Sequence, residues 1–229
     1  MVNVQKHKFI LVNILKDIYG DTSLNSFLGF KGGTAAYLFY GLHRFSVDLD
    51  FNLLNPDKKD FVFEKLKNIL KKYGKLKEAR GKRFTIFFLL SYGEKEQNIK
   101  IEVSKKEFPN HYEVKNYLGI SMLVMKKEDM LAHKLVALLE RKNLASRDLF
   151  DLWYFMKNDW EINEKLVELR TNTPIKDYLR KCIEVVKSFN EKYILQGIGE
   201  LLEKNQKDWT KGNLKKDVLF LLNFYSEKI

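Results

Sequence analysis

The 229-residue sequence has few of the residues that mark secreted, metal-ligated or membrane-spanning proteins. Its single cysteine, Cys182, excludes an intrachain disulfide, and its four scattered histidines argue against a zinc site. The longest apolar run, around Phe84 to Leu90, is as long as a strand and far shorter than the roughly 18 residues of a membrane span. No apolar stretch is followed by a small-residue cleavage site of the kind found in signal peptides. We therefore expect a cytoplasmic protein that has no membrane partner.

Positive charge is what the sequence has in excess. Lysine and arginine number 41 against 30 acidic residues, which gives a net charge of +11. Residues 57–106 hold 15 of these basic residues against 7 acidic ones, a local net charge of +8. Such an excess favours an anionic partner such as RNA, DNA, a nucleotide or an acidic protein. A solvated, lysine-rich surface explains the charge equally well, so charge alone does not decide the function.

The order of the expected elements divides the chain near residue 120. Helical periodicity over 4–19, 34–40 and 58–73 alternates with strand patterns over 27–31, 47–54, 83–92 and 98–104. Gly93-Glu94-Lys95 is expected to form a hairpin loop, and a variable stretch follows around Pro109. From Lys127 onward the period is helical, with breaks expected near Asn143, Pro174, Gly197 and Gly212. The predicted domains are an α/β domain over residues 1–120 and a helical domain over 121–229.

Two acidic residues, Asp48 and Asp50, lie two positions apart in an expected strand. Residues at this spacing point to the same face, so both carboxylates are expected to face outward while Leu49 and Phe51 face the core. Because neighbouring like charges repel, a cation is expected to offset them, and a pair of divalent ions is common where phosphates are bound. An ordinary amphipathic strand with one wet face is the alternative interpretation of this pair alone.

A glycine pair precedes these acids. Lys31 ends an expected strand, Gly32 and Gly33 follow, and Thr34 begins a helix. Glycines let the backbone approach an anion closely, and free N–H groups at a helix start complement a phosphate. Thr34 is expected to cap the helix or to donate its hydroxyl to the phosphate. A plain helix-start turn remains the alternative.

A third acid, Glu102, is expected on the polar face of the strand 98–104, next to Lys100. If this strand neighbours the strand that carries Asp48 and Asp50, three carboxylates meet in one patch. A metal pair held there could align an attacking oxygen with an α-phosphate. The alternative is an exposed carboxylate that pairs with Lys100.

Residues 31–51, KGGTAAYLFYGLHRFSVDLDF, closely resemble the signature of the AbiEii/AbiGii-type nucleotidyltransferase toxins. This family belongs to the DNA polymerase β-like superfamily and includes the MenT toxins. The glycine motif, Arg44-x-Ser46, Asp48-x-Asp50 and the later acid fall in family order. Lys134 and the block Arg147-Asp148-Leu149-Phe150-Asp151-Leu152 resemble its last motif. The resemblance covers about residues 28–155.

The resemblance implies roles for the matching positions. Asp48 and Asp50 would bind magnesium, two ions being expected, and Glu102 would assist them and act as base toward the incoming hydroxyl. The residues that would hold the triphosphate or brace the loop around it are Lys31, Gly32, Gly33, Thr34, Arg44 and Ser46. In the second block Lys134 would contact phosphate, with Asp148 and Asp151 as accompanying catalytic acids.

The second block has a physical interpretation of its own. Asp148 and Asp151 lie in an unusually apolar helix, and buried carboxylates are costly unless they are paired. Lys134, Arg141 and Arg147 are the candidate partners. A structural ion pair that ties two helices together is therefore an alternative to a catalytic role.

We predict an α+β fold: a polymerase β-like mixed sheet with flanking helices, followed by a C-terminal helical bundle that contributes to the active-site cleft. The resemblance implies a magnesium-dependent nucleotidyltransferase that moves a nucleoside monophosphate from a nucleoside triphosphate to an acceptor and releases pyrophosphate. The acceptor would be RNA, with the tRNA 3′ end favoured, and the protein would be the toxin of a bacterial toxin–antitoxin or phage-defence pair with a cognate antitoxin. Transfer to a small molecule or a protein, and a catalytically silent RNA-binding scaffold, are the alternatives.

Overall fold

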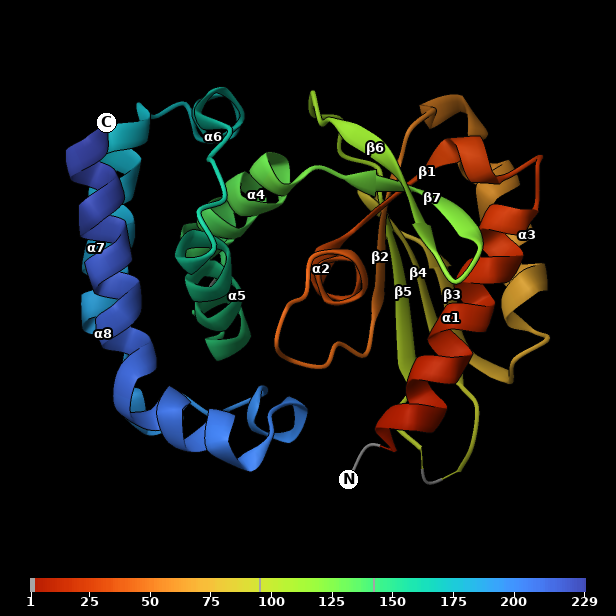
Figure 1. Ribbon diagram of the computed structural model, residues 1–229. Coiled ribbons are helices and arrows are strands. Elements are labelled where there is room, and N and C mark those ends of the chain that lie inside the picture. The colour runs from red at the N-terminus through yellow and green to blue at the C-terminus, as the bar shows by residue number, and fades with distance from the viewer. Residues whose placement is uncertain (1–2, 95, 142) are drawn as a thin grey trace. The chain divides into compact units, whose positions relative to one another are not determined.

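The computed structural model describes residues 3–94, 96–141 and 143–229, which form two compact units (Figure 1). The first unit comprises residues up to 107 together with 111–125, and the second comprises 108–110 and 126–229. The helices of the first unit are α1 (Val4–Gly20), α2 (Gly32–Phe39) and α3 (Lys59–Leu70), with the short turns η1 (Asn25–Phe27) and η2 (Pro56–Lys58). Its strands are β1 (Leu28–Lys31), β2 (Leu49–Leu53), β3 (Lys75–Gly81), β4 (Thr85–Ser91), β5 (Ile99–Ser104), β6 (Tyr112–Tyr117) and β7 (Ile120–Met125).

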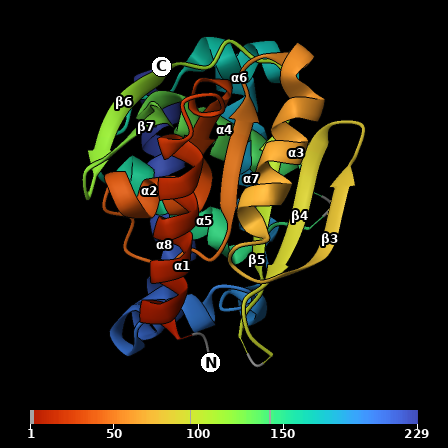
Figure 2. The ribbon, with the colours of Figure 1, turned by 90° about the vertical axis from the view of Figure 1, so that its right-hand side faces the viewer.

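These strands form one mixed sheet in the order β3-β4-β5-β2-β1-β7-β6. β2 runs parallel to β5 and β1 runs parallel to β7, whereas the other neighbours are antiparallel. Helices α1 and α3 lie side by side on one face of the sheet, and α2 lies on the side away from α3 (Figures 1 and 2). Phe63 of α3 stacks on Phe88 of β4, with ring centroids 5.2 Å apart, and so identifies the face that α3 covers.

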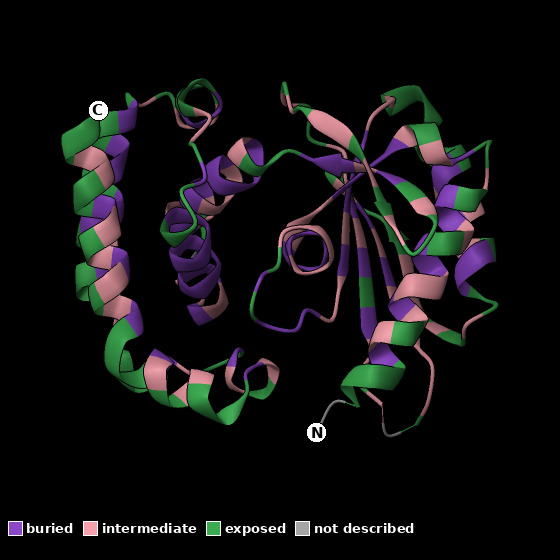
Figure 3. Ribbon diagram, in the orientation of Figure 1, coloured by how far each residue is buried: buried purple, intermediate pink, exposed green. Residues whose placement is uncertain are grey.

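The second unit is helical. It consists of α4 (Lys127–Glu140), α5 (Ser146–Lys157), α6 (Glu164–Thr171), α7 (Ile175–Ser188), the turns η3 (Glu191–Tyr193) and η4 (Gly199–Leu201), and α8 (Lys204–Lys228). Helix α5 is buried on nearly every side, as Figure 3 shows, because it packs against both α4 and α8. No described helix is long and apolar enough to cross a bilayer.

The predicted fold class, a mixed sheet with flanking helices followed by C-terminal helices, is confirmed. The sequence analysis missed both edge strands, β3 and β6, and with β6 it missed β7. Edge strands are accessible on more sides than central strands and often carry charged residues, so neither shows a clear apolar alternation. The predicted break at Gly212 is wrong, because α8 continues through this exposed glycine. The predicted hairpin loop includes Lys95, which lies outside the described residues.

Candidate active site

Two of the three predicted acids lie on adjacent strands of the first unit, and the third lies just before one of these strands. β2 and β5 are parallel with Asp50 directly beside Glu102, so the two side chains share one face. Asp48 precedes β2 by one residue, and its Oδ1 accepts a hydrogen bond of 3.2 Å from the backbone N–H of Lys100. All three carboxylates are half-buried. The sheet therefore gathers side chains that are more than fifty residues apart in the sequence.

The first glycine of the motif packs directly on Asp50. Gly32 has a φ of +79°, and a Cβ on it would lie 2.4 Å from Asp50 Oδ2. An L-residue is strained at this φ, and no side-chain atom fits in the remaining space. Lys31 is the register partner of Asp50 on β1. A glycine is therefore required where the backbone turns from β1 into α2 beside the carboxylate.

The remaining motif residues hold the loop 40–48 against the start of α2. Thr34 is buried, and its hydroxyl donates to the backbone carbonyl of Asp48. A Cβ on Gly33 would lie 2.8 Å from an Nη atom of Arg44 and 2.9 Å from Ser46 Oγ. Arg44 is itself buried and donates to the carbonyl of Phe45 at 3.1 Å. These contacts tie the backbone of Asp48 to the glycine motif.

Replacing Gly32 with alanine is expected to lower nucleotide transfer at least tenfold. The new methyl group would displace the Asp50 carboxylate or change the backbone φ, at a cost of about 1–2 kcal/mol for the left-handed conformation alone. Steady-state transfer rates and circular dichroism would measure the effect. Gly20→Ala is the matched control, because a Cβ there meets nothing within 4 Å and its activity should stay at the parental level.

The donor set fits magnesium. Among the residues that the structure describes, no three His, Cys, Asp or Glu side chains lie close enough together to hold a metal ion by themselves. Magnesium, however, is usually held by one or two carboxylates together with water and substrate phosphates. Asp50 beside Glu102, with Asp48 two residues earlier, supplies hard oxygen ligands of that kind.

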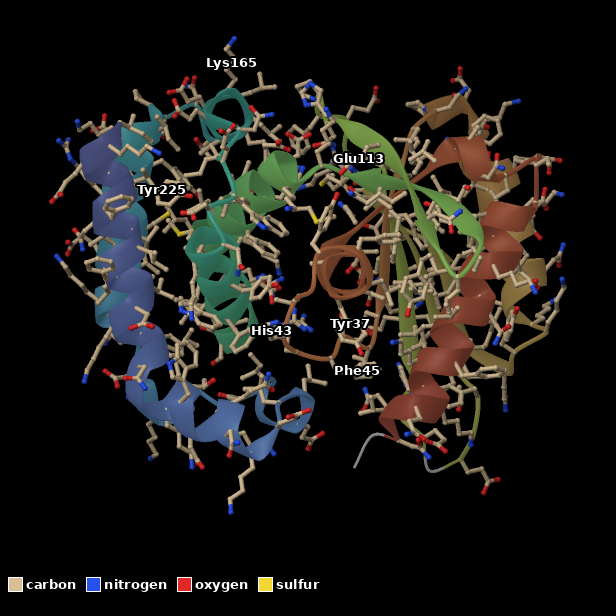
Figure 4. All side chains as sticks on the ribbon, viewed as in Figure 1. Tyr37, His43, Phe45, Glu113, Lys165 and Tyr225 are labelled. Atoms are coloured by element: carbon tan, nitrogen blue, oxygen red, sulfur yellow. The ribbon has the colours of Figure 1, made fainter. Side chains whose placement is uncertain are left out.

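His7 supports this site and was missed by the sequence analysis. Its ring is buried, with Nε2 2.9 Å from the carbonyl oxygen of Val47 and Nδ1 2.7 Å from the Tyr92 hydroxyl. The rings of Tyr37, Phe45 and His7 follow one another edge to face, at 5.6 and 5.7 Å between centroids, and Figure 4 shows Tyr37 beside Phe45. One signal was available: His7 falls on the apolar face of α1 with Leu11 and Ile14.

Burial lowers the pKa of His7 below its ordinary value, so the neutral ring is the native form. Below about pH 6.5 the unfolded chain binds more protons at this residue than the folded chain does, so this contribution to stability is lost as the pH falls. We expect the difference in unfolding free energy between the parent and His7→Gln to shrink from about pH 8 to about pH 5. Urea denaturation followed by circular dichroism would test this, and a constant difference would contradict it.

The second block forms a buried ion cluster in the second unit. Lys134 Nζ of α4 lies 2.8 Å from Asp148 Oδ1 and 2.7 Å from Asp151 Oδ2 of α5. Arg141 Nε lies 2.9 Å from the other oxygen of Asp148. Both carboxylates are completely buried, whereas the Lys134 side chain is 18% exposed. The cluster therefore ties α4 to α5, and the distances from Lys134 do not favour one aspartate over the other.

A cavity of about 750 Å³ adjoins this cluster within the second unit. It lies between the end of α4, the start of α5 and the end of α7, with Arg141, Ser146 and Phe189 among its lining residues. The Ser146 hydroxyl donates a hydrogen bond of 2.9 Å to the backbone carbonyl of Tyr193, and both residues line the cavity. Arg141 thus contacts both the cavity and the buried Asp148.

The family model for the nucleotidyl transferase AbiEii toxin of type IV toxin–antitoxin systems matches residues 13–212. The chain belongs to the AbiEii family. It is therefore a nucleotidyltransferase of the kind found as the toxin in these systems, and the family implies a nucleotide substrate and an antitoxin partner. The match extends beyond the residues 28–155 on which the resemblance rests, and it includes most of the helical second unit.

Two solved structures share the fold of this AbiEii protein. A candidate nucleotidyltransferase from H. pylori is 21% identical, with a TM-score of 0.66, and the alignment covers 100% of this chain and 96% of that one. JHP933 from Helicobacter pylori is 22% identical, with a TM-score of 0.59 and a coverage of 100% and 97%. No curated protein sequence matches the chain.

Proposed function

We propose that this AbiEii protein transfers a nucleoside monophosphate from a nucleoside triphosphate to a hydroxyl group of RNA, with the tRNA 3′ end as the favoured acceptor. The observation that carries the proposal is the register of Asp50 beside Glu102, next to a glycine motif that leaves no room for a side chain. Carboxylates and the backbone N–H groups at a helix start suit a substrate with a triphosphate. The basic segment 57–106 suits the phosphate backbone of a nucleic acid acceptor.

The reaction is an in-line displacement at the α-phosphorus. The acceptor hydroxyl oxygen bonds to that phosphorus, the bond from it to the α–β bridging oxygen breaks, and the bridging oxygen leaves as part of pyrophosphate. Glu102 takes the hydroxyl proton, and Gly32 and Gly33 bring backbone N–H groups to the triphosphate. Asp48, Asp50 and Glu102 would hold magnesium together with water and the substrate phosphates, and the ion would neutralise phosphate charge.

The test is incubation of purified protein with each α-labelled nucleoside triphosphate, magnesium and total RNA. Label in a tRNA-sized band, with the parent protein and not with Asp48→Asn, would support the proposal and identify the nucleotide. Label in protein or in a small product would keep the chemistry and overturn the RNA acceptor. Label in no product would overturn the transfer reaction.

A further inference from the structure

The row of side chains that contains Asp50 and Glu102 continues across the sheet to its edge. β5 is antiparallel to β4 with Glu102 directly opposite Phe87, and β4 is antiparallel to β3 with Phe87 directly opposite Arg80. Directly opposed residues share a face, so acids, aromatic ring and guanidinium form one line. With strands about 4.8 Å apart, Arg80 lies roughly 10 Å from Glu102.

Phe87 is not part of the core that α3 covers. Phe88, the next residue along β4, is fully buried and stacks on Phe63 of α3. Alternation therefore points Phe87 to the opposite face, where it is half-buried. The ammonium group of Lys82 lies over the Phe87 ring, 4.3 Å from its centroid. A half-buried aromatic ring and a cation in contact with it are two components of surfaces on which nucleic acid bases stack.

The edge strand next to this ring is strongly basic. Residues 75–83 include five lysines and arginines and one acid, Glu78. Glu78 contacts Arg80 at 3.0 Å and Lys82 at 4.0 Å, and it neutralises only part of their charge. The side chains of Arg80 and Lys82 are 66% and 52% exposed, so they remain accessible to an anion. In Figure 2, β3 forms the outer edge of the sheet beside β4.

We propose that the β3–β4 ribbon binds the single-stranded RNA segment that leads to the acceptor hydroxyl, an inference that rests on the proposed function. Phe87 stacks on a base of this segment, and Arg80 and Lys82 contact its phosphates. The charges support this placement of the RNA, because the basic residues of β3 attract its phosphates and the carboxylates at the other end of the row repel them. When a base stacks on Phe87, the next nucleotides of the RNA lie beside Glu102. Glu102 is the residue that accepts the proton of the acceptor hydroxyl in the proposed reaction.

The test measures binding of a labelled RNA hairpin with a single-stranded 3′ overhang, and of its blunt-ended counterpart, by fluorescence anisotropy at several salt concentrations. Phe87→Leu is expected to weaken binding of the overhang about tenfold and to leave the blunt hairpin unchanged, because the two hairpins share the same loop and differ only in the unstacked bases of the overhang. Arg80→Ser and Lys82→Ser are each expected to weaken binding and to lower the salt slope by about 0.7–0.9. In transfer assays, Phe87→Leu should raise KM for RNA and leave KM for the nucleoside triphosphate unchanged.

Two matched controls are available. Phe84 lies three residues from Phe87 and is 49% exposed, with Arg83 and Lys106 near its ring, but it precedes β4 and so lies outside the row of Glu102, Phe87 and Arg80. Phe84→Leu should therefore leave binding of the overhang unchanged. Lys181→Ser removes an exposed lysine of α7 in the second unit and should have little effect. Circular dichroism would confirm that each variant is folded.

The outcomes separate this surface from the proposed function. If RNA accepts label but Phe87→Leu and Phe84→Leu bind the overhang equally, the surface is wrong and the proposed function stands. If Phe87→Leu weakens both hairpins alike, the surface recognises duplex and the single-strand assignment is overturned. If label goes to protein or a small product and neither hairpin binds, the RNA acceptor and the surface both fail.

Discussion

Asp48→Asn is expected to reduce nucleotide transfer by about 10³-fold or more, because it removes one of the charges that would hold magnesium against the triphosphate. Asparagine keeps the shape of the side chain and an oxygen that can accept the hydrogen bond from the N–H of Lys100. The fold should therefore be unchanged, and the loss should appear in turnover. Single-turnover transfer from α-labelled nucleoside triphosphate is the measurement.

Asp57→Asn is the matched control for this prediction. Asp57 is an exposed acid of η2 in the same unit, and the same change of charge there should leave transfer near the parental rate. Transfer by Asp48→Asn within tenfold of the parent, in a protein with parental circular dichroism, would contradict the assignment of Asp48.

Lys134→Met is expected to destabilise the second unit by about 3–5 kcal/mol, because it removes the cation nearest to two completely buried carboxylates. The three tryptophans, Trp153, Trp160 and Trp209, all lie in this unit. Urea unfolding followed by tryptophan fluorescence therefore reports on it selectively.

Two comparisons test whether the lost stability comes from the buried charges around Lys134. Lys187→Met breaks an exposed pair with Glu184 on α7 and should change stability little. Adding Asp148→Asn and Asp151→Asn to Lys134→Met should recover much of the lost stability, because the two buried side chains that Lys134 contacted are then uncharged. An unchanged unfolding midpoint for Lys134→Met would show that the cluster does not tie α4 to α5.

The central strands were predictable because each shows a clear hydrophobic pattern over a few consecutive residues. β2 and β5 alternate apolar residues with polar ones, and β4 is a long apolar run, so burial leaves a visible pattern in all three. β3 and β6 lie at the edges of the sheet, where few positions need an apolar residue. Gly212 misled the sequence analysis because an exposed glycine inside a long helix costs only about 1 kcal/mol, which α8 tolerates.

Local signals in the sequence determined the catalytic class. The glycine pair, the acids Asp48 and Asp50 at the start of β2, and the later acid Glu102 indicate the chemistry by their residue types and their spacing. The family assignment rests on the same residues, and the family match extends it over residues 13–212. A physical constraint explains the pattern: at Gly32, a φ of +79° and the contact with Asp50 both exclude a side chain.

Only the tertiary structure decided which residues surround these motifs, because that depends on strand order and register. Asp50 lies beside Glu102, and Glu102 opposite Phe87, since the sheet places β5 between β2 and β4. Neither pairing can be read from sequence distance, because a shift of one residue would reverse every side chain. The contact between His7 and Val47 likewise depends on the tertiary structure, because the two residues are 40 positions apart in the sequence. The sequence thus determined the chemistry of the site. Packing and strand register determined which residues, such as His7, support the site and which surface lies beside it.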